Sequence, residues 1–332
     1  RLHCDANAVT DVGIVDRSVV VETFPDRPCG REEFVVVEIQ QCHLGTLGGT
    51  RHAGRTDRRR DQHVRVDAWQ HDRTMPVDTA IPSAEDNQQA LDDLLTLLDL
   101  ETIELNIFRG ASTDEDRLRV FGGQVAGQAL IAAGRTIDEP GRLVHSLHAY
   151  FLRPGDPKRP ILYEVDRIRD GRSFSTRRVV AVQHGRAIFN LQASFHDEET
   201  GGPDHQVPMD EGLTPPDELP DFHTRMAPHA ERIGGWYHRP RPIDLRYVDG
   251  DPMSRQGESN TGQHVWLRAN GSIPGDDPLL HACLLTYASD MTLLDTTLLP
   301  FGLPFDHPGL QMASLDHAMW FHRPFRVDEW LM

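Results

Sequence analysis

The chain contains an internal repeat, and this repeat constrains its fold more than any other feature. Residues 150–154 read Tyr-Phe-Leu-Arg-Pro and residues 320–324 read Trp-Phe-His-Arg-Pro, so the two segments lie 170 positions apart. Each segment follows an apolar helical pattern and stands at the end of a strand pattern. A five-residue match is weak alone, but the order of the surrounding elements agrees with it. The sequence therefore predicts two copies of one helix-plus-sheet unit.

The first copy begins with two helical patterns. Ser83 can cap a helix, and acidic residues follow it in the first turn, where the helix dipole favours them. After a strand candidate at residues 103–108, residues 121–134 form an apolar stretch rich in glycine and alanine. We expect a buried helix there, whose small residues let a sheet approach closely. The first helix is amphipathic, with leucines at the i, i+3, i+4, i+7 positions Leu91, Leu94, Leu95 and Leu98.

Four strand patterns follow the buried helix. The last is the clearest, because apolar and polar residues alternate from Ala187 to Phe195. Such alternation is typical of an antiparallel sheet with one covered face, and His184 with Gly185 suits a short hairpin turn before it. The expected fold class is α+β, a central helix wrapped by an antiparallel sheet with strands at residues 144–152, 161–168, 173–182 and 187–195.

A linker and a second copy come next. The linker is acidic and rich in proline and glycine, as expected of a surface crossing. Beyond it, two strand patterns, an apolar helical stretch and a further strand occupy residues 243–248, 264–269, 278–294 and 310–321. The predicted organisation is an extension at 1–74, a first repeat at 75–196, a linker at 197–222 and a second repeat at 223–332.

Both ends of the chain depart from the repeated unit. Residues 1–74 show no sustained periodicity, and we interpret them as disordered or non-native upstream sequence; the alternative is a nucleic-acid-binding or regulatory arm. Short strand candidates lie within them at residues 19–21 and 34–39. In the first copy 41 residues lead from Pro154 to Phe195, whereas only eight follow Pro324. We therefore expect a truncated second repeat with an open sheet edge.

Composition excludes several function classes. The net charge of −17 argues against nucleic acid as a partner. No apolar run reaches the roughly 18 residues of a membrane span, and the N-terminus lacks a signal-peptide pattern, so we expect a cytoplasmic protein. The four cysteines form no CxxC pair, which argues against a disulfide framework or a metal site.

Six segments resemble signatures of the acyl-CoA thioesterase II family, whose fold is a double hotdog. The resemblance covers roughly residues 91–332 apart from the linker. It implies hydrolysis of medium- to long-chain acyl-CoA to free fatty acid and CoA by an activated water, without a metal or organic cofactor. The segments are FGGQVAGQAL (121–130), FLRPGD (151–156), RDGRSFSTRRV (169–179), WLRANG (266–271), LLTYASDM (284–291) and ASLDHAMWFHRPF (313–325).

The same resemblance implies a catalytic site in the second repeat. The family's aspartate corresponds to Asp290 and its Thr or Ser to Ser314, while its glutamine would fall beyond Met332. A carboxylate can take a proton from water, and a hydroxyl can hold that water at attack distance. Asp316 and His317 look like a relay pair, but neighbours on a strand face opposite sides, so we assign them structural roles. Weaker candidates for substrate binding are Gly123, Gln124, Arg153 and Arg323.

Two alternatives remain open. One is a non-catalytic acyl-CoA-binding hotdog protein, in which case the fragment itself is inactive. The other is an enoyl-CoA hydratase, which the sequence disfavours because no Asp and His are paired at helical spacing. In each case we expect an acyl-CoA ligand and a homo-oligomer, with neither nucleic acid nor membrane as a partner.

Overall fold

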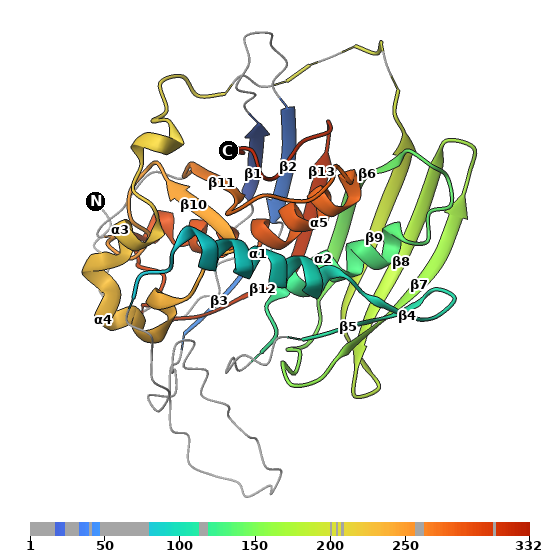
Figure 1. Cartoon of the computed structure of the whole chain (residues 1–332), viewed down its shortest axis with the longest axis horizontal. Helices are drawn as coiled ribbons and strands as arrows, with labels where there is room; N and C mark the ends of the chain where they lie inside the picture. Colours follow the sequence, from blue (N-terminus) through green and yellow to red (C-terminus); the bar gives the residue numbers. More distant parts are fainter. Residues whose placement is uncertain are drawn as a thin grey trace, which may run out of the picture.

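A nine-stranded antiparallel sheet dominates the molecule (Figure 1). The computed structural model describes residues 80–112, 119–199, 201–203, 205–206, 209–255, 262–307 and 310–332, with three N-terminal strands at 17–23, 33–39 and 42–46. The strands run in the order β1-β2-β13-β6-β9-β8-β7-β5-β4. Their bounds are β1 Arg17–Thr23, β2 Glu33–Ile39, β4 Glu101–Glu104, β5 Ile107–Gly110, β6 Arg142–Phe151, β7 Ile161–Asp170, β8 Phe174–Gln183, β9 Arg186–Asp197 and β13 Asp316–Phe321.

Helix α2 (Gly122–Gly134) lies in the curve of this sheet, against β7, β8 and β9. Every residue from Gly123 to Ala133 is buried, because glycine and alanine cover most of the helix surface and let the strands come close. Helix α1 (Ala84–Leu98) packs beside α2, and the predicted cap is confirmed, since the Ser83 hydroxyl accepts a hydrogen bond from the Asp86 N–H. The expected helix wrapped by an antiparallel sheet is therefore confirmed.

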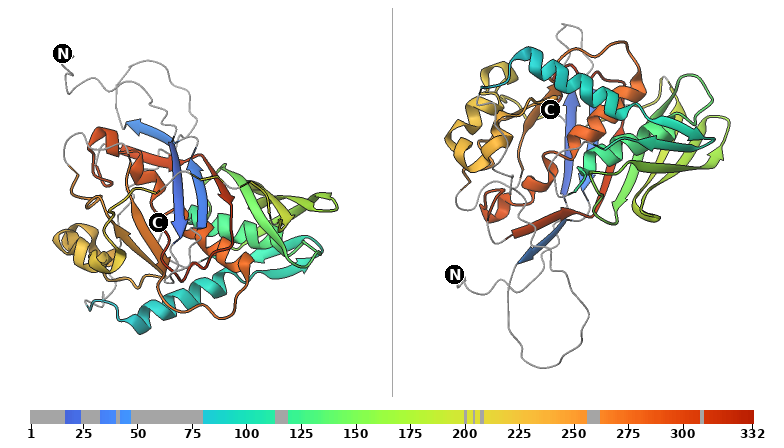
Figure 2. Two further views of the ribbon diagram at one scale, coloured as in Figure 1. Left: turned by 90° about the horizontal axis from the view of Figure 1, so that it is seen from above. Right: turned by 60° about the horizontal axis from the view of Figure 1, so that its bottom comes forward.

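The second repeat supplies a second apolar helix, α5 (Pro278–Ser289), which lies alongside α2 (Figure 2). The two helices approach closely where α2 has no side chains: a Cβ on Gly123 would overlap the Tyr287 carbonyl oxygen, and one on Gly127 would lie 3.1 Å from the Cys283 carbonyl oxygen. The other elements of this part are α3 Phe222–Met226, α4 Ala230–Ile233, α6 Leu293–Thr296, β10 Ile243–Tyr247, β11 Val265–Ala269 and β12 Leu310–Ser314.

The register of β6 and β13 shows how the repeats are related. His148 pairs with Ala318 across the two strands, and Ala318 is also the residue 170 positions after His148. An antiparallel pair centred on two equivalent residues has a local two-fold axis there, as at the self-complementary interface of a symmetric dimer. The turns that follow these strands also end alike. Ile161 and Leu331, again 170 positions apart, each pair with an earlier strand of their own repeat: Ile161 with Gly110 of β5, and Leu331 with Leu267 of β11. The predicted internal repeat is thereby confirmed.

Three predicted elements differ from the structure in detail. The strand expected at 103–108 is the β4–β5 hairpin, whose turn holds Asn106 at φ 61°, a left-handed conformation that Asn tolerates. The strand expected at 310–321 breaks at Leu315, because its two halves have different neighbours: β12 pairs with β3 (Cys42–Thr46), whereas β13 pairs with β6 and β2. The helix expected at 278–294 ends at Ser289.

The N-terminal extension contributes three strands to this arrangement. The candidates at 19–21 and 34–39 lie in β1 and β2, and β2 lies against β13 in the main sheet. The interpretation of residues 1–74 as disordered or non-native stays a prediction, as do the boundaries of the predicted domains. In the part of the chain that the structure describes, no helix combines the length and the apolar character that a membrane crossing requires.

Candidate active site

Asp290 stands where three elements meet. It is the C-cap residue of α5, and its side chain is only 10% exposed. The backbone N–H of Gly123, in the first turn of α2, donates a hydrogen bond to its carboxylate, and so does the hydroxyl of Ser314 at the end of β12. The structure therefore brings together the two predicted site residues, although 24 positions separate them in the chain.

The first turn of α2 is open to a negative charge. Its N-cap residue, Phe121, makes no side-chain cap, so the hydrogen-bonding demand of the first N–H groups is left to other partners. A Cβ on Gly122 would lie 2.6 Å from Oδ2 of Asp290, so only glycine lets the carboxylate sit this close to the helix end. The helix dipole and the N–H groups of the first turn together favour an anion at this position.

Burial makes Asp290 a much stronger base than an ordinary aspartate. Loss of contact with water raises its pKa from 3.8 to about 7, against the opposing effects of the Gly123 N–H, the positive charge of Arg119 and the Ser314 hydroxyl. A carboxyl that titrates near neutral pH can both take a proton and return it. Among the described carboxyls, burial raises the pKa this far only for Asp290 and for Asp295, whose value rises to about 6.

Ser314 owes its position to the break between β12 and β13. The strand pairing ends at Ser314, and the next carbonyl, that of Leu315, accepts a hydrogen bond from the Phe151 N–H instead. The hydroxyl can donate to Asp290 while its lone pairs accept from a water molecule. Around these residues, as elsewhere in the described chain, no three His, Cys, Asp or Glu side chains gather in a way that could hold a metal ion.

His317 is a third polar residue at this place, and the sequence analysis assigned it a structural role. It is fully buried on β13, with Nε2 3.0 Å from the Ser289 hydroxyl and Nδ1 4.0 Å from Oδ1 of Asp290. Burial lowers its pKa from 6.5 to about 4, so the imidazole is uncharged at neutral pH. Asp316 faces the other way, where its carboxylate lies 3.2 Å from Nε2 of His148. The opposite orientation of these neighbours was correctly predicted, but a purely structural role for His317 does not follow from it.

The equivalent place in the first repeat lacks these groups. At an offset of 170 residues, Ser314 corresponds to Val144 and His317 to Leu147, both apolar and buried. The N-terminus of α5 is closed as well, because the Asp277 side chain caps it and Pro278 has no N–H to offer. Only one of the two symmetry-related places in the described chain thus carries a carboxylate, a hydroxyl and a free helix end. This comparison of repeats is also the signal that could have identified His317.

The weaker sequence candidates have mainly structural contacts, apart from Gly123. Gln124 is buried and donates to the Ala111 carbonyl. Arg153 donates to the Ala187 carbonyl at 2.6 Å, which ties the turn after β6 to the β8–β9 hairpin. Arg323 lies half-buried at the equivalent turn after β13. The structure thus places Gly123 at the candidate site, through its contact with Asp290.

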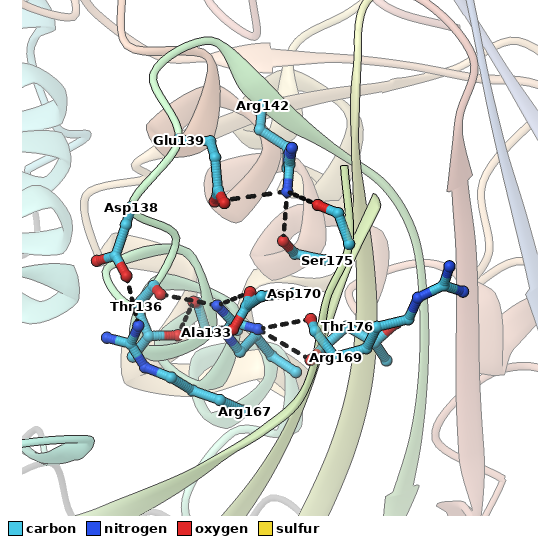
Figure 3. A network of polar contacts seen from close by, with 12 residues as sticks. Ala133, Thr136, Asp138, Glu139, Arg142, Arg167, Arg169, Asp170, Ser175 and Thr176 are labelled. Carbon is cyan, nitrogen blue, oxygen red and sulfur yellow. Dashed lines mark hydrogen bonds and ion pairs between the residues drawn. The ribbon is translucent and has the colours of Figure 1, made fainter. Parts of the chain in front are cut away.

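The signature at 169–179 fixes the far end of α2 (Figure 3). Arg177 is fully buried there, with Nε 2.7 Å from the Thr136 hydroxyl and Nη2 2.6 Å from the Asp170 carboxylate. The same guanidinium donates to the Thr136 carbonyl just past the helix end, where a positive charge complements the helix dipole. Arg177 therefore anchors the C-terminal end of α2 to β7 and β8.

The chain is similar in sequence to known acyl-CoA thioesterases. Residues 112–196 match the family described as "Acyl-CoA thioesterase N-terminal domain", and residues 246–332 match the family "Acyl-CoA thioesterase". Acyl-coenzyme A thioesterase 8 of Homo sapiens is 41% identical over 71% of this chain and 76% of its own length. Acyl-CoA thioesterase 2 of Haemophilus influenzae is 38% identical over 72% of this chain and 84% of its own length.

Solved structures agree with this similarity. The acyl-CoA thioesterase II TesB2 from Mycobacterium marinum is 44% identical, with a TM-score of 0.57 over 72% of this chain and 83% of that protein. A hot dog fold protein from Alicyclobacillus acidocaldarius, at 16% identity, has a TM-score of 0.51 over 71% of this chain and 99% of its own, and supports the fold alone. Both matched regions contain a helix at the Asp290 site: α2 lies within residues 112–196, and α5 lies within residues 246–332.

Proposed function

Because the chain belongs to the acyl-CoA thioesterase family and is a thioester hydrolase of double-hotdog fold, we propose that Asp290 is its general base. The observation that carries this proposal is the position of its buried carboxylate, between the open N-terminus of α2 and the Ser314 hydroxyl. We further propose medium- to long-chain fatty acyl-CoA as the substrate.

The reaction follows from the chemistry of these groups. A water molecule held by Ser314 and Asp290 loses a proton to the carboxylate while its oxygen bonds to the thioester carbonyl carbon. The C–S bond of the tetrahedral intermediate then breaks, and the CoA thiolate takes the proton back from the Asp290 carboxyl. The products are the fatty acid and CoA thiol, and Asp290 returns to its ionised form.

The N-terminus of α2 stabilises the negative charge that develops on the thioester carbonyl oxygen. When water attacks, the carbonyl oxygen becomes an oxyanion, and it needs donors fixed in place before the reaction. The first turn of α2 offers backbone N–H groups and the positive end of the helix dipole next to Asp290. Removal of a single donor of this kind commonly costs about a hundredfold in rate.

Hydrolysis in heavy-oxygen water tests the proposed route. In a single turnover, direct attack by water puts the heavy oxygen into the fatty acid and leaves the Asp290 carboxyl unlabelled. Heavy oxygen recovered in the peptide that contains Asp290 would instead show a covalent acyl-aspartate, and would contradict a general-base role. Binding of acyl-CoA without any thiol release would support the non-catalytic alternative.

Ser314→Ala tests the positioning of the water. The variant keeps the Asp290 carboxylate and the helix end but loses the hydroxyl, so we expect kcat to fall at least about tenfold with KM little changed. Asp316→Asn is a matched control, because it changes a buried polar side chain of the same segment that faces away from the site. Unchanged kcat in Ser314→Ala would remove this residue from the mechanism.

Three further expectations from the sequence remain proposals: the chain-length preference, the homo-oligomer and the cytoplasmic location. Chain-length preference is tested by kcat/KM across a series of acyl-CoA substrates, and the predicted homo-oligomer by light scattering. The cytoplasmic location is tested by fractionation of cells that produce the protein.

A further inference from the structure

We propose that His317 is a positioning residue for Asp290: its uncharged Nδ1 accepts a hydrogen bond from the carboxylic acid that forms when Asp290 takes a proton from water. This inference rests on the proposed function, in which Asp290 is the base. It extends the site from the two residues predicted from sequence to a third, inner residue on β13.

The tautomer of His317 follows from its neighbours. The Ser289 hydroxyl has one hydrogen, and two acceptors besides His317 lie within its reach: the Thr286 carbonyl oxygen of its own helix at 3.0 Å and Sδ of Met319 at 3.5 Å. With the hydrogen donated to either of these acceptors, the hydroxyl oxygen accepts at the 3.0 Å contact with His317, and the imidazole hydrogen lies on Nε2, which is the tautomer that the proposal requires. Nδ1 is left with a lone pair, has no hydrogen-bond partner, and lies in a fully buried side chain.

Nδ1 is the imidazole nitrogen that lies near the carboxyl group of Asp290. Nδ1 lies 4.0 Å from Oδ1 of Asp290, whereas Oδ2 is the oxygen close to Gly122 at the helix end. A movement of about 1 Å by either side chain closes the first distance to a hydrogen bond. A lone pair opposite an ionised oxygen is unfavourable, but opposite a carboxylic acid it is an acceptor, so it favours the protonated form.

The repeat shows that this position does not require a histidine for folding. The counterpart of His317 in the first copy is Leu147, which is buried on β6 in the equivalent register. Burying an imidazole with an unused lone pair costs stability relative to leucine. In the second repeat this position is nevertheless a histidine, and there the neighbouring helix, α5, ends at the carboxylate of Asp290.

The other charged or titratable groups near this pair are few among the described side chains. Arg119 precedes α2 and acts on Asp290, and His148 on β6 acts on His317. Asp316 is adjacent on β13 but is directed toward His148. The pKa directions agree with the geometry, since burial raises that of Asp290 and lowers that of His317, so the proton resides on the carboxyl.

Two amide variants separate the role of Nδ1 from that of packing. His317→Gln keeps a polar atom near the Ser289 hydroxyl but removes the acceptor beside Asp290; His317→Asn keeps an acceptor near the Nδ1 position and loses the Ser289 contact. We expect Gln to move the acid limb of the kcat/KM profile about one unit lower and to reduce kcat about tenfold. The Asn variant should keep the limb in place. If the acid limb of the kcat/KM profile stays at the wild-type pH in both variants, the proposal is overturned.

A second measurement needs no catalysis, so it distinguishes failure of this inference from failure of the proposed function. Unfolding free energies are measured for the wild type, His317→Gln, Asp290→Ala and the double variant, at about pH 5 and about pH 8, because alanine, unlike asparagine, leaves no donor for Nδ1. We expect a coupling that favours the native protein at the lower pH, where Asp290 is protonated, and that vanishes or reverses at the higher pH. A coupling that is the same at both values would contradict the hydrogen bond.

Discussion

At the scale of single residues, the site depends on a carboxylate held where it is poorly solvated. Asp290 caps α5, contacts the Gly123 N–H and the Ser314 hydroxyl, and is nearly covered by its surroundings. The same burial that makes it a base at neutral pH reduces the stability of the folded protein. Activity and stability therefore respond in opposite ways to changes at this residue, and each response can be measured.

The pH dependence of hydrolysis is the first expected response. Because Asp290 must be ionised to accept a proton, and its pKa is raised to about 7, kcat/KM should fall as the pH drops through about 7. An ordinary aspartate would keep activity constant down to about pH 4. A profile measured with purified protein that stays flat from about pH 8 to about pH 5 would contradict the role of Asp290 as base.

The second expected response is a change in the stability of the Asp290→Asn variant. The native protein binds the Asp290 proton more tightly than the unfolded chain, so this group's contribution to stability is complete below pH 3.8 and is lost as the pH rises to about 7. Asparagine never ionises, so at about pH 8 the variant should be more stable by on the order of 1–3 kcal/mol. Denaturant unfolding measures this difference, and a less stable variant at that pH would contradict the burial argument.

Sequence reasoning located Asp290 and Ser314 but not His317, and the reason is geometric. The first two lie in segments that resemble family signatures, so the roles proposed for them could be predicted without coordinates. His317 lies beside Asp316, and a pair of adjacent strand residues gives no indication of which helix each will face. Only the packing of β13 against the end of α5 shows that His317 faces Asp290.

At the scale of elements, the N-terminal turn of α2 combines two requirements. Its glycines allow close packing against α5 and also leave room for the Asp290 carboxylate. The other end of the helix is anchored by Arg177 through Thr136. The helix was predictable from its apolar stretch, but its distance from α5 was not, because that distance depends on a contact between the repeats.

Gly122→Ala separates the need for room at the Asp290 carboxylate from the need for close packing between α2 and α5. The added Cβ would lie 2.6 Å from Oδ2 of Asp290 and should displace the carboxylate, so we expect kcat of the folded protein to fall at least about tenfold. Gly127→Ala is the matched control, since its Cβ meets the Cys283 carbonyl at 3.1 Å, one turn away from the site. It should lower the melting temperature by crowding the helices but keep kcat. Equal loss of kcat in both variants would indicate general disruption instead.

Element boundaries were less predictable than element types, and the reasons differ. The break at Leu315 arises because β12 and β13 pair with different strands, which no local pattern reveals. The β4–β5 hairpin depends on one residue, Asn106, in the left-handed conformation. In each case a contact or a dihedral angle interrupts a run of residues that favours a continuous strand.

At the scale of the whole molecule, the two repeats share one sheet and one helix pair. β13 and β6 pair as the third and fourth strands of the sheet, and α2 and α5 pack against each other. The two-fold relation of the backbone was predictable from the repeat in sequence. The asymmetry of its chemistry was visible in the sequence as Val144 and Leu147 opposite Ser314 and His317, once the offset is applied.

Shared elements imply that the repeats unfold together. Neither copy can lose its central strand without exposing the edge of the other, so we expect a single calorimetric transition with equal calorimetric and van't Hoff enthalpies. Two resolved transitions, one for each repeat, would show that the β6–β13 pairing contributes little to the stability of the pair.

The most direct test of the account is the turnover of Asp290→Asn. Thiol release from a long-chain acyl-CoA is measured at about pH 8 for the wild type, for Asp290→Asn and for Asp316→Asn as control, with folding checked by circular dichroism. We predict that Asp290→Asn loses kcat by about a hundredfold or more while KM changes little, and that the control keeps wild-type turnover. Wild-type turnover in a folded Asp290→Asn protein would contradict the account.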